Sequence, residues 1–179
     1  MAETKEIKTT EEGLQKAGAD VKEGIVNSLK GVNEIEAEIV SVARNTVSNT
    51  LQASGNVAKE VVSVTTDVIK GAVQATEEVG TGLIMGAKSV AKGIILGVSD
   101  VGGDLVTAAG QTASGAVKAA ADVGADVATV ARRTVDGMIE ATKEVGGNVE
   151  KVATSAVTGA IGAAGTVGKS ATRAVTDVL

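Results

Sequence analysis

Hydrophobic residues recur along the chain at intervals of eleven positions, in a register that holds from Ile35 to Val178. With Val79 as the origin, apolar or small residues also fall four and eight positions later in successive blocks. Positions 0, 4, 8 and 11 follow a period of about 3.67 residues, close to the helical value of about 3.6. A strand would require alternation at every second residue, which these columns lack. The pattern therefore predicts an all-α protein.

A longer period of 22 residues is carried by glycine and divides the chain into blocks. One set of glycines comprises Gly80, Gly102, Gly124, Gly146 and Gly168. A second set comprises Gly71, Gly93, Gly115, Gly137 and Gly159. The period predicts a polar N-terminal leader at residues 1–13, followed by a tandem array of 22-residue amphipathic helical repeats over residues 14–179.

The glycines and the absence of proline leave two arrangements of this array open. Without proline nothing forces a break, so one long amphipathic helix fits the pattern. Each interior glycine costs a helix about 1 kcal/mol relative to alanine, so packing or a surface must supply stability. If the array folds into helical hairpins or a bundle, the pairs Gly102–Gly103 and Gly146–Gly147 are the expected turns. The glycines mark such hinges, or they let another helix or a lipid surface approach closely.

The apolar columns form one wide, shallow face that we take as the binding surface. It covers about 160° of the helix circumference, more than the seam of a two-stranded coiled coil. A lipid surface, helices of the same protein or helices of another protein are the three partners that fit it. The residues expected to carry binding are Val61, Val68, Val79, Leu83, Val90, Ile94, Val101, Leu105, Val123, Val127, Met138, Val145 and Val149.

The composition excludes several classes of function. The chain has no His, Cys, Phe, Trp or Tyr, so it offers no imidazole base, no thiolate nucleophile and no usual zinc ligand set. A net charge of −5 without aromatic residues argues against nucleic acid. We therefore expect no catalytic residues, no cofactor, no metal and no small-molecule substrate. The start of the chain lacks a secretory pattern and cysteine is absent, which fits a cytoplasmic protein.

Three local motifs suggest specific sites, but each has a simpler structural explanation. Residues 163–170 match a permissive phosphate-loop pattern, but Gly168 already belongs to a repeat column and no strand is expected before it. The most apolar stretch, residues 79–98, carries Lys88 and Lys92 in its middle, which disfavours a membrane span. Arg132–Arg133 would suit anionic headgroups, although a solvated face is the simpler interpretation.

Tandem eleven-residue units joined into 22-residue blocks resemble several groups of amphipathic-helix proteins. Residues 21–25, Val-Lys-Glu-Gly-Ile, are similar to the K-E-G-V element of synucleins. The pattern also resembles exchangeable apolipoproteins, perilipins, the phasins that coat polyester granules, and late-embryogenesis-abundant proteins. The resemblance is one of period and composition over residues 14–179. It implies a helix that lies on or between surfaces.

The sequence thus supports a non-enzymatic amphipathic protein that coats a lipid or hydrophobic granule surface, peripheral to a membrane or granule. The alternative is a structural protein that assembles with itself as a homo-oligomer, in a bundle or filament. A stress-protective protein of the late-embryogenesis-abundant kind is a third possibility. A coat protein should gain helix on lipid, whereas a self-assembler should be helical without it.

Overall fold

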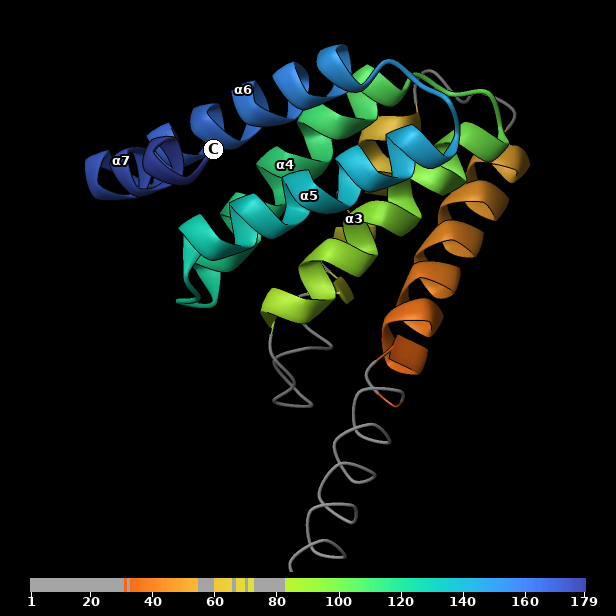
Figure 1. Cartoon of the computed structure of the whole chain (residues 1–179), viewed down its shortest axis with the longest axis horizontal. Coiled ribbons are helices and arrows are strands. Elements are labelled where there is room, and N and C mark those ends of the chain that lie inside the picture. Colours follow the sequence, from red (N-terminus) through yellow and green to blue (C-terminus); the bar gives the residue numbers. More distant parts are fainter. Residues whose placement is uncertain (1–30, 32, 55–59, 66, 70, 73–82) are drawn as a thin grey trace, which may run out of the picture. The chain divides into compact units, whose positions relative to one another are not determined.

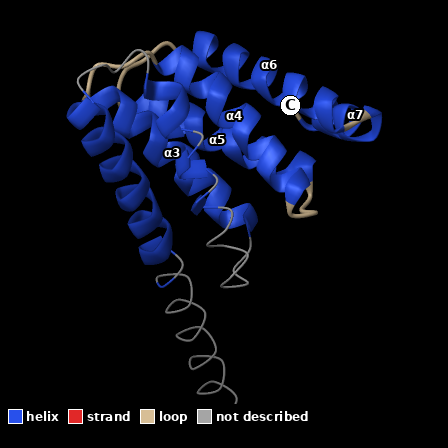
Figure 2. Ribbon diagram, turned by 180° about the vertical axis from the view of Figure 1, so that it is seen from behind, coloured by secondary structure: helices blue, strands red, loops and turns tan. Residues whose placement is uncertain are grey.

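The described part of this computed structural model is helical, which confirms the all-α prediction. It comprises residues 31, 33–54, 60–65, 67–69, 71–72 and 83–179, and no strand occurs among them (Figure 2). The chain divides into two compact units, Met1–Ile35 and Glu36–Leu179. Of the first unit only residues 31 and 33–35 are described, and they are helical. The predicted leader at residues 1–13 lies outside the described residues.

The described part of the second unit contains two helical segments followed by five helices (Figure 1). We call the first segment the 36–54 helix, and the second, described at 60–65, 67–69 and 71–72, the 60–72 segment. The helices are α3 (Leu83–Asp100), α4 (Leu105–Asp122), α5 (Val127–Glu144), α6 (Val149–Val167) and α7 (Lys169–Val178). From α3 to α6 each helix is followed by a break at a glycine, so this part of the chain is not one continuous rod.

The turns after α3, α4 and α5 share one construction. Gly102, Gly124 and Gly146 have φ angles of 66°, 69° and 71°, the left-handed region that glycine enters without a steric cost. After α4, for example, the backbone N–H of Ala125 donates to the carbonyl oxygen of Ala120 at 2.8 Å, which closes the helix end. The expected turns at Gly102–Gly103 and Gly146–Gly147 are confirmed.

Each of these turns is followed by a residue that caps the N-terminus of the next helix. Asp104, Asp126 and Asn148 accept hydrogen bonds from backbone N–H groups of the first turns of α4, α5 and α6. The Asp126 carboxylate also accepts a bond of 2.7 Å from the Thr129 hydroxyl. These contacts lower the pKa of Asp126, with the Thr129 hydroxyl as the largest cause. Because such residues satisfy the free N–H groups of a helix start, they fix where each helix begins.

The break between α6 and α7 is built differently. Gly168 has a φ of 148° and separates the two helices alone, without a four-residue turn and without a side-chain cap for α7. Its N–H donates to the carbonyl oxygen of Ala164, and its own carbonyl accepts from the N–H of Thr172. Helix α7 then packs on α5 and α6 and buries Val175 completely.

The helices form two layers, because the closest packing joins elements two apart along the chain. Helix α3 lies along α5, and α4 lies along α6 (Figure 1). The 36–54 helix continues the first layer by packing on α3, and the 60–72 segment continues the second by contacting α4. Contacts between consecutive helices hold the layers together.

Glycines of the second set allow this close approach within a layer. A Cβ atom at Gly93 of α3 would lie 2.6 Å from the carbonyl oxygen of Val40 in the 36–54 helix. A Cβ at Gly137 of α5 would collide with the Lys88 carbonyl of α3, and one at Gly159 of α6 with the Gly110 carbonyl of α4. Because these neighbours are backbone atoms, only glycine fits. Gly102, Gly124 and Gly146 of the first set therefore lie in turns, whereas Gly93, Gly137 and Gly159 of the second set lie in close helix contacts.

The interior is filled by small side chains. In α4 six of the eight buried residues are alanine, and the other two are Thr112 and Val117. Larger fully buried side chains are Leu51, Ile94, Ile95 and Met138. Since alanine buries little apolar area, stability depends on the close approach of the backbones as well as on hydrophobic burial.

Candidate apolar binding groove

The predicted binding face lies mostly inside the protein, between its own helices. Val61, Val90, Ile94 and Met138 are buried in the core. Val68, Val101, Leu105 and Val127 are half-buried and pack against that core, and Val149 is also half-buried. Val123 and Val145, each 36% exposed, cap the ends of α4 and α5. Val79 and the side chain of Leu83 lie outside the described part. Most of these residues are thus not free to contact an external surface in this fold.

Among the described residues, an apolar groove of about 750 Å³ is open between the 36–54 helix, the 60–72 segment and the start of α3. Its floor includes Ala43, Val64 and Val90, which are buried. Val42 stands at its edge with 57% of its surface exposed. The described residues that line this apolar groove are Glu38, Ile39, Val42, Ala43, Thr46, Thr50, Val64, Asp67, Val68, Gly71, Ala72, Gly86 and Val90.

The charged residues among this lining are both acidic. Glu38 comes from the 36–54 helix and Asp67 from the 60–72 segment, and both are exposed. No basic side chain is present among the described lining residues. Thr46 and Thr50 add hydroxyl groups on the helix that carries Glu38. The groove therefore combines an apolar interior with two negative charges, a combination suited to an amphipathic ligand.

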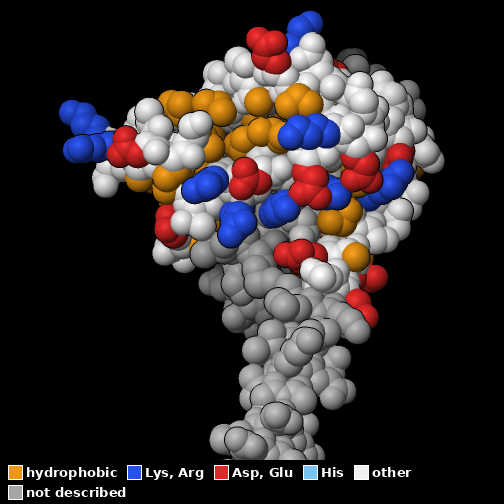
Figure 3. All heavy atoms as spheres, in the orientation of Figure 1, with side chains coloured by type: hydrophobic (Ala, Val, Ile, Leu, Met, Phe, Trp, Pro, Cys, Tyr) orange, Lys and Arg blue, Asp and Glu red, His pale blue; other side chains and the backbone are white. Residues whose placement is uncertain are grey.

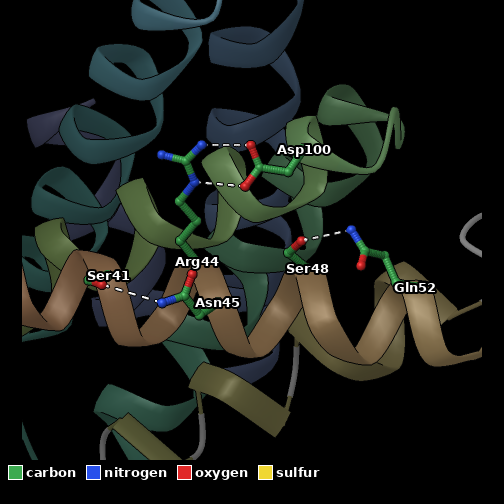
Figure 4. Close-up of polar contacts among 6 residues, drawn as sticks. All are labelled: Ser41, Arg44, Asn45, Ser48, Gln52 and Asp100. Atoms are coloured by element: carbon green, nitrogen blue, oxygen red, sulfur yellow. Dashed lines mark hydrogen bonds and ion pairs between the residues drawn. The ribbon is translucent and has the colours of Figure 1, made fainter.

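The opposite side of the 36–54 helix is polar and is fixed to α3 by an ion pair. Arg44 donates two hydrogen bonds of 2.7 Å to the two carboxylate oxygens of Asp100 at the end of α3 (Figure 4). These hydrogen bonds lower the pKa of Asp100 and raise that of Arg44. On the same helix Asn45 donates to Ser41 and Gln52 to Ser48, each at 3.4 Å (Figure 4). The bidentate ion pair thus links the 36–54 helix to the end of α3.

A second group of charges joins α3 to α5. Lys88 and Lys92 both lie 2.8 Å from the Glu140 carboxylate, and Lys92 also lies 3.0 Å from that of Glu144. The two lysines, Lys88 first, lower the pKa of Glu140 to about 2. Basic and acidic side chains alternate across the face shown in Figure 3. The lysines that interrupt the apolar stretch 79–98 thus serve as ion-pair partners.

The remaining motifs do not form sites in this fold. The phosphate-loop pattern runs across the break at Gly168: residues 163–167 are the last residues of α6 and residues 169–170 the first of α7, so no strand precedes it. Arg132 and Arg133 are exposed on α5. Among the described residues no group of His, Cys, Asp or Glu is arranged to hold a metal ion. No described helix is long and apolar enough to cross a membrane.

The groove involves residues that the periodic pattern alone does not single out. Val42 lies seven positions after a member of the Val79 column, at an offset that is also apolar, and Asp67 lies ten positions after one, where acidic residues such as Asp100 and Asp122 recur. Neither recurrence shows which part of the face stays uncovered. Glu38 follows no column that we identified. These three residues come together only because segments about 25 to 30 residues apart pack near each other, and a local pattern does not predict such packing.

Comparison with known proteins gives no relative. No protein family, no curated protein and no solved structure matches the chain.

Proposed function

We propose that this is a non-enzymatic helical protein that binds a lipid or another hydrophobic surface through the apolar groove. The observation that carries the proposal is the groove itself: Val42 is exposed there and Ile39 and Val68 are only half-buried, whereas Ile94 and Met138 of the predicted face are fully buried in the core. The 36–54 helix packs on α3 and the 60–72 segment contacts α4, so the two layers from α3 to α6 serve as the scaffold of the groove. Binding then needs no unfolding of the scaffold.

The position of Val42 supports this assignment. It is a large hydrophobic side chain that is 57% exposed at the edge of a groove whose floor is apolar. Covering such a side chain with an acyl chain removes apolar surface from water at about 25 cal/mol per Å². The other exposed valines of the scaffold, such as Val123 and Val145, lie singly at helix ends. Isolated exposed valines are common on protein surfaces and imply no ligand.

Flotation with phosphatidylcholine vesicles tests the proposal. We expect the wild-type protein to float with the vesicles and the Val42→Asn variant to bind several-fold more weakly. Val145→Asn is the matched control, because Val145 is exposed on the scaffold but lies outside the groove. Equal binding by all three proteins, or no binding by the wild type, would contradict the assignment.

We also propose that the chain is a tandem array of 22-residue units, each consisting of a helix and the turn that follows it. Support comes from the spacing: Gly102, Gly124 and Gly146 occupy equivalent turns 22 residues apart. The capping residues after them keep the same interval. An array of this kind is extended by stacking further helices on its ends.

Self-assembly is the second candidate function, favoured by the stacking of helices two apart along the chain. Stacking a second copy on an end of the protein would continue this packing between two chains. Light scattering over a dilution series distinguishes the candidates, since a self-assembler dissociates on dilution. A mass that stays monomeric at every concentration would exclude self-assembly.

A further inference from the structure

We infer that the apolar groove selects single-chain amphiphiles with a cationic head group. The inference rests on the proposed function, binding of apolar ligands in this groove, and adds the charge of the ligand. Its basis is the combination of an apolar floor with Glu38 and Asp67 as the charged side chains of the described lining. The two carboxylates come from different helical segments, and both line the groove.

The size of the groove fits a small amphiphile. Its volume of about 750 Å³ lies within the range of about 300 to 1,000 Å³ typical of small-molecule sites. An alkyl chain would contact Ile39, Val42 and Val68, while the head group remains at the solvent-exposed carboxylates. No bond is made or broken, so the molecule is a ligand rather than a substrate.

Electrostatics decides which head group is preferred. An ammonium near two carboxylates is attracted, whereas a fatty-acid carboxylate is repelled by both. Among the described residues of the 36–54 helix and the 60–72 segment, the cation is Arg44, whose guanidinium is bound to Asp100 on the other side of the helix. Since Glu38 and Asp67 are exposed, solvent and salt weaken the attraction. A preference of about five-fold for the cation at low salt is the expected size.

Isothermal titration calorimetry with decyltrimethylammonium, decanoate and uncharged decyl maltoside, each below its micelle-forming concentration, tests the inference. The wild-type protein should bind the cation about five-fold more tightly than decanoate, with decyl maltoside between them. In the double variant Glu38→Gln, Asp67→Asn the three affinities should become equal. Asp136→Asn on α5 is the matched control and should keep the wild-type order.

The outcomes separate the inference from the proposed function. Equal affinities for all three amphiphiles in the wild type would overturn the charge selectivity and leave apolar binding in place. Absence of binding by any of them would overturn both. Unchanged binding by Val42→Asn would place the ligand elsewhere and overturn the inference. If the wild type were a dimer and the Val42→Asn variant a monomer, the groove would be occupied by a second copy of the chain. That result would also overturn the inference.

Discussion

Buried threonines in the core illustrate how single atoms affect this fold. The hydroxyl oxygens of Thr65, Thr112 and Thr134 are buried, and no hydrogen-bond partner is present for them in the described structure. A buried polar group without a partner is destabilising, because it loses its bonds to water and gains none. Val90 occupies the column of Thr112 and Thr134 in α3, so valine is accepted at an equivalent place.

Replacement of these threonines by valine should therefore stabilise the protein. Thr112→Val and Thr134→Val keep the shape of the side chain and remove the unpaired hydroxyl, for a gain of roughly 1 kcal/mol each. Urea unfolding followed by far-UV circular dichroism measures the change. Thr142→Val serves as the contrast, because the Thr142 hydroxyl donates to the Met138 carbonyl oxygen at 2.7 Å. A loss of stability in the Thr112 and Thr134 variants would show that those hydroxyls are satisfied.

Glycine has opposite effects at neighbouring positions of α6. Gly159→Ala places a Cβ against the Gly110 carbonyl, so we expect destabilisation by roughly 1–3 kcal/mol. Gly162→Ala meets no atom within 4 Å and should stabilise the helix by up to about 1 kcal/mol. The same urea titration compares the two variants. Similar effects of both substitutions would argue against the tight contact between α4 and α6.

At the scale of elements, the contact between α3 and α5 depends on pH. The pKa of Glu140 falls from 4.5 to about 2 because Lys88 and Lys92 bind its charged form. A lowered pKa means that this contribution is complete above about pH 4.5 and is lost as the pH falls towards 2. Because the Glu140 side chain is 45% exposed, the effect is about 1 kcal/mol or less.

Glu140→Gln should make stability less sensitive to acid between about pH 4.5 and 2. Chemical unfolding of the wild type and the variant at both ends of this range measures the difference. Asp136→Asn, an exposed carboxylate on the same helix, provides the control. If the acid-induced loss is the same in the Glu140→Gln variant and the wild type, the ion pair does not contribute.

The helices themselves could be predicted from the sequence, since their features are local. The eleven-residue period gave the helical class, and the positions of Gly102 and Gly146 gave the turns. The partner of each helix was not predictable. Gly137 lies against the backbone of Lys88, 49 residues earlier, and the pairing of Lys88 with Glu140 spans a similar distance. A local period shows that a face is apolar but does not show what covers it.

At the scale of the whole molecule, the location of the candidate site was not predictable for the same reason, because a local pattern does not show which residues neighbouring helices cover. Residues such as Ile94 and Met138 match the predicted apolar face, yet both are fully buried by neighbouring helices. Val42 belongs to the same pattern and remains exposed because the fold leaves a groove between the 36–54 helix and the 60–72 segment. Which part of an amphipathic pattern is available for binding thus depends on tertiary packing.

Hydrogen exchange measured by mass spectrometry, with and without phosphatidylcholine vesicles, tests this account most directly. We predict that α3 to α6 are protected from exchange without vesicles and keep that protection when vesicles are added. The 36–54 helix should gain protection on binding, because the apolar groove lies along it. If α3 to α6 lost protection when vesicles were added, or were protected only in the presence of vesicles, the buried face would open onto the lipid. Either result would contradict the account.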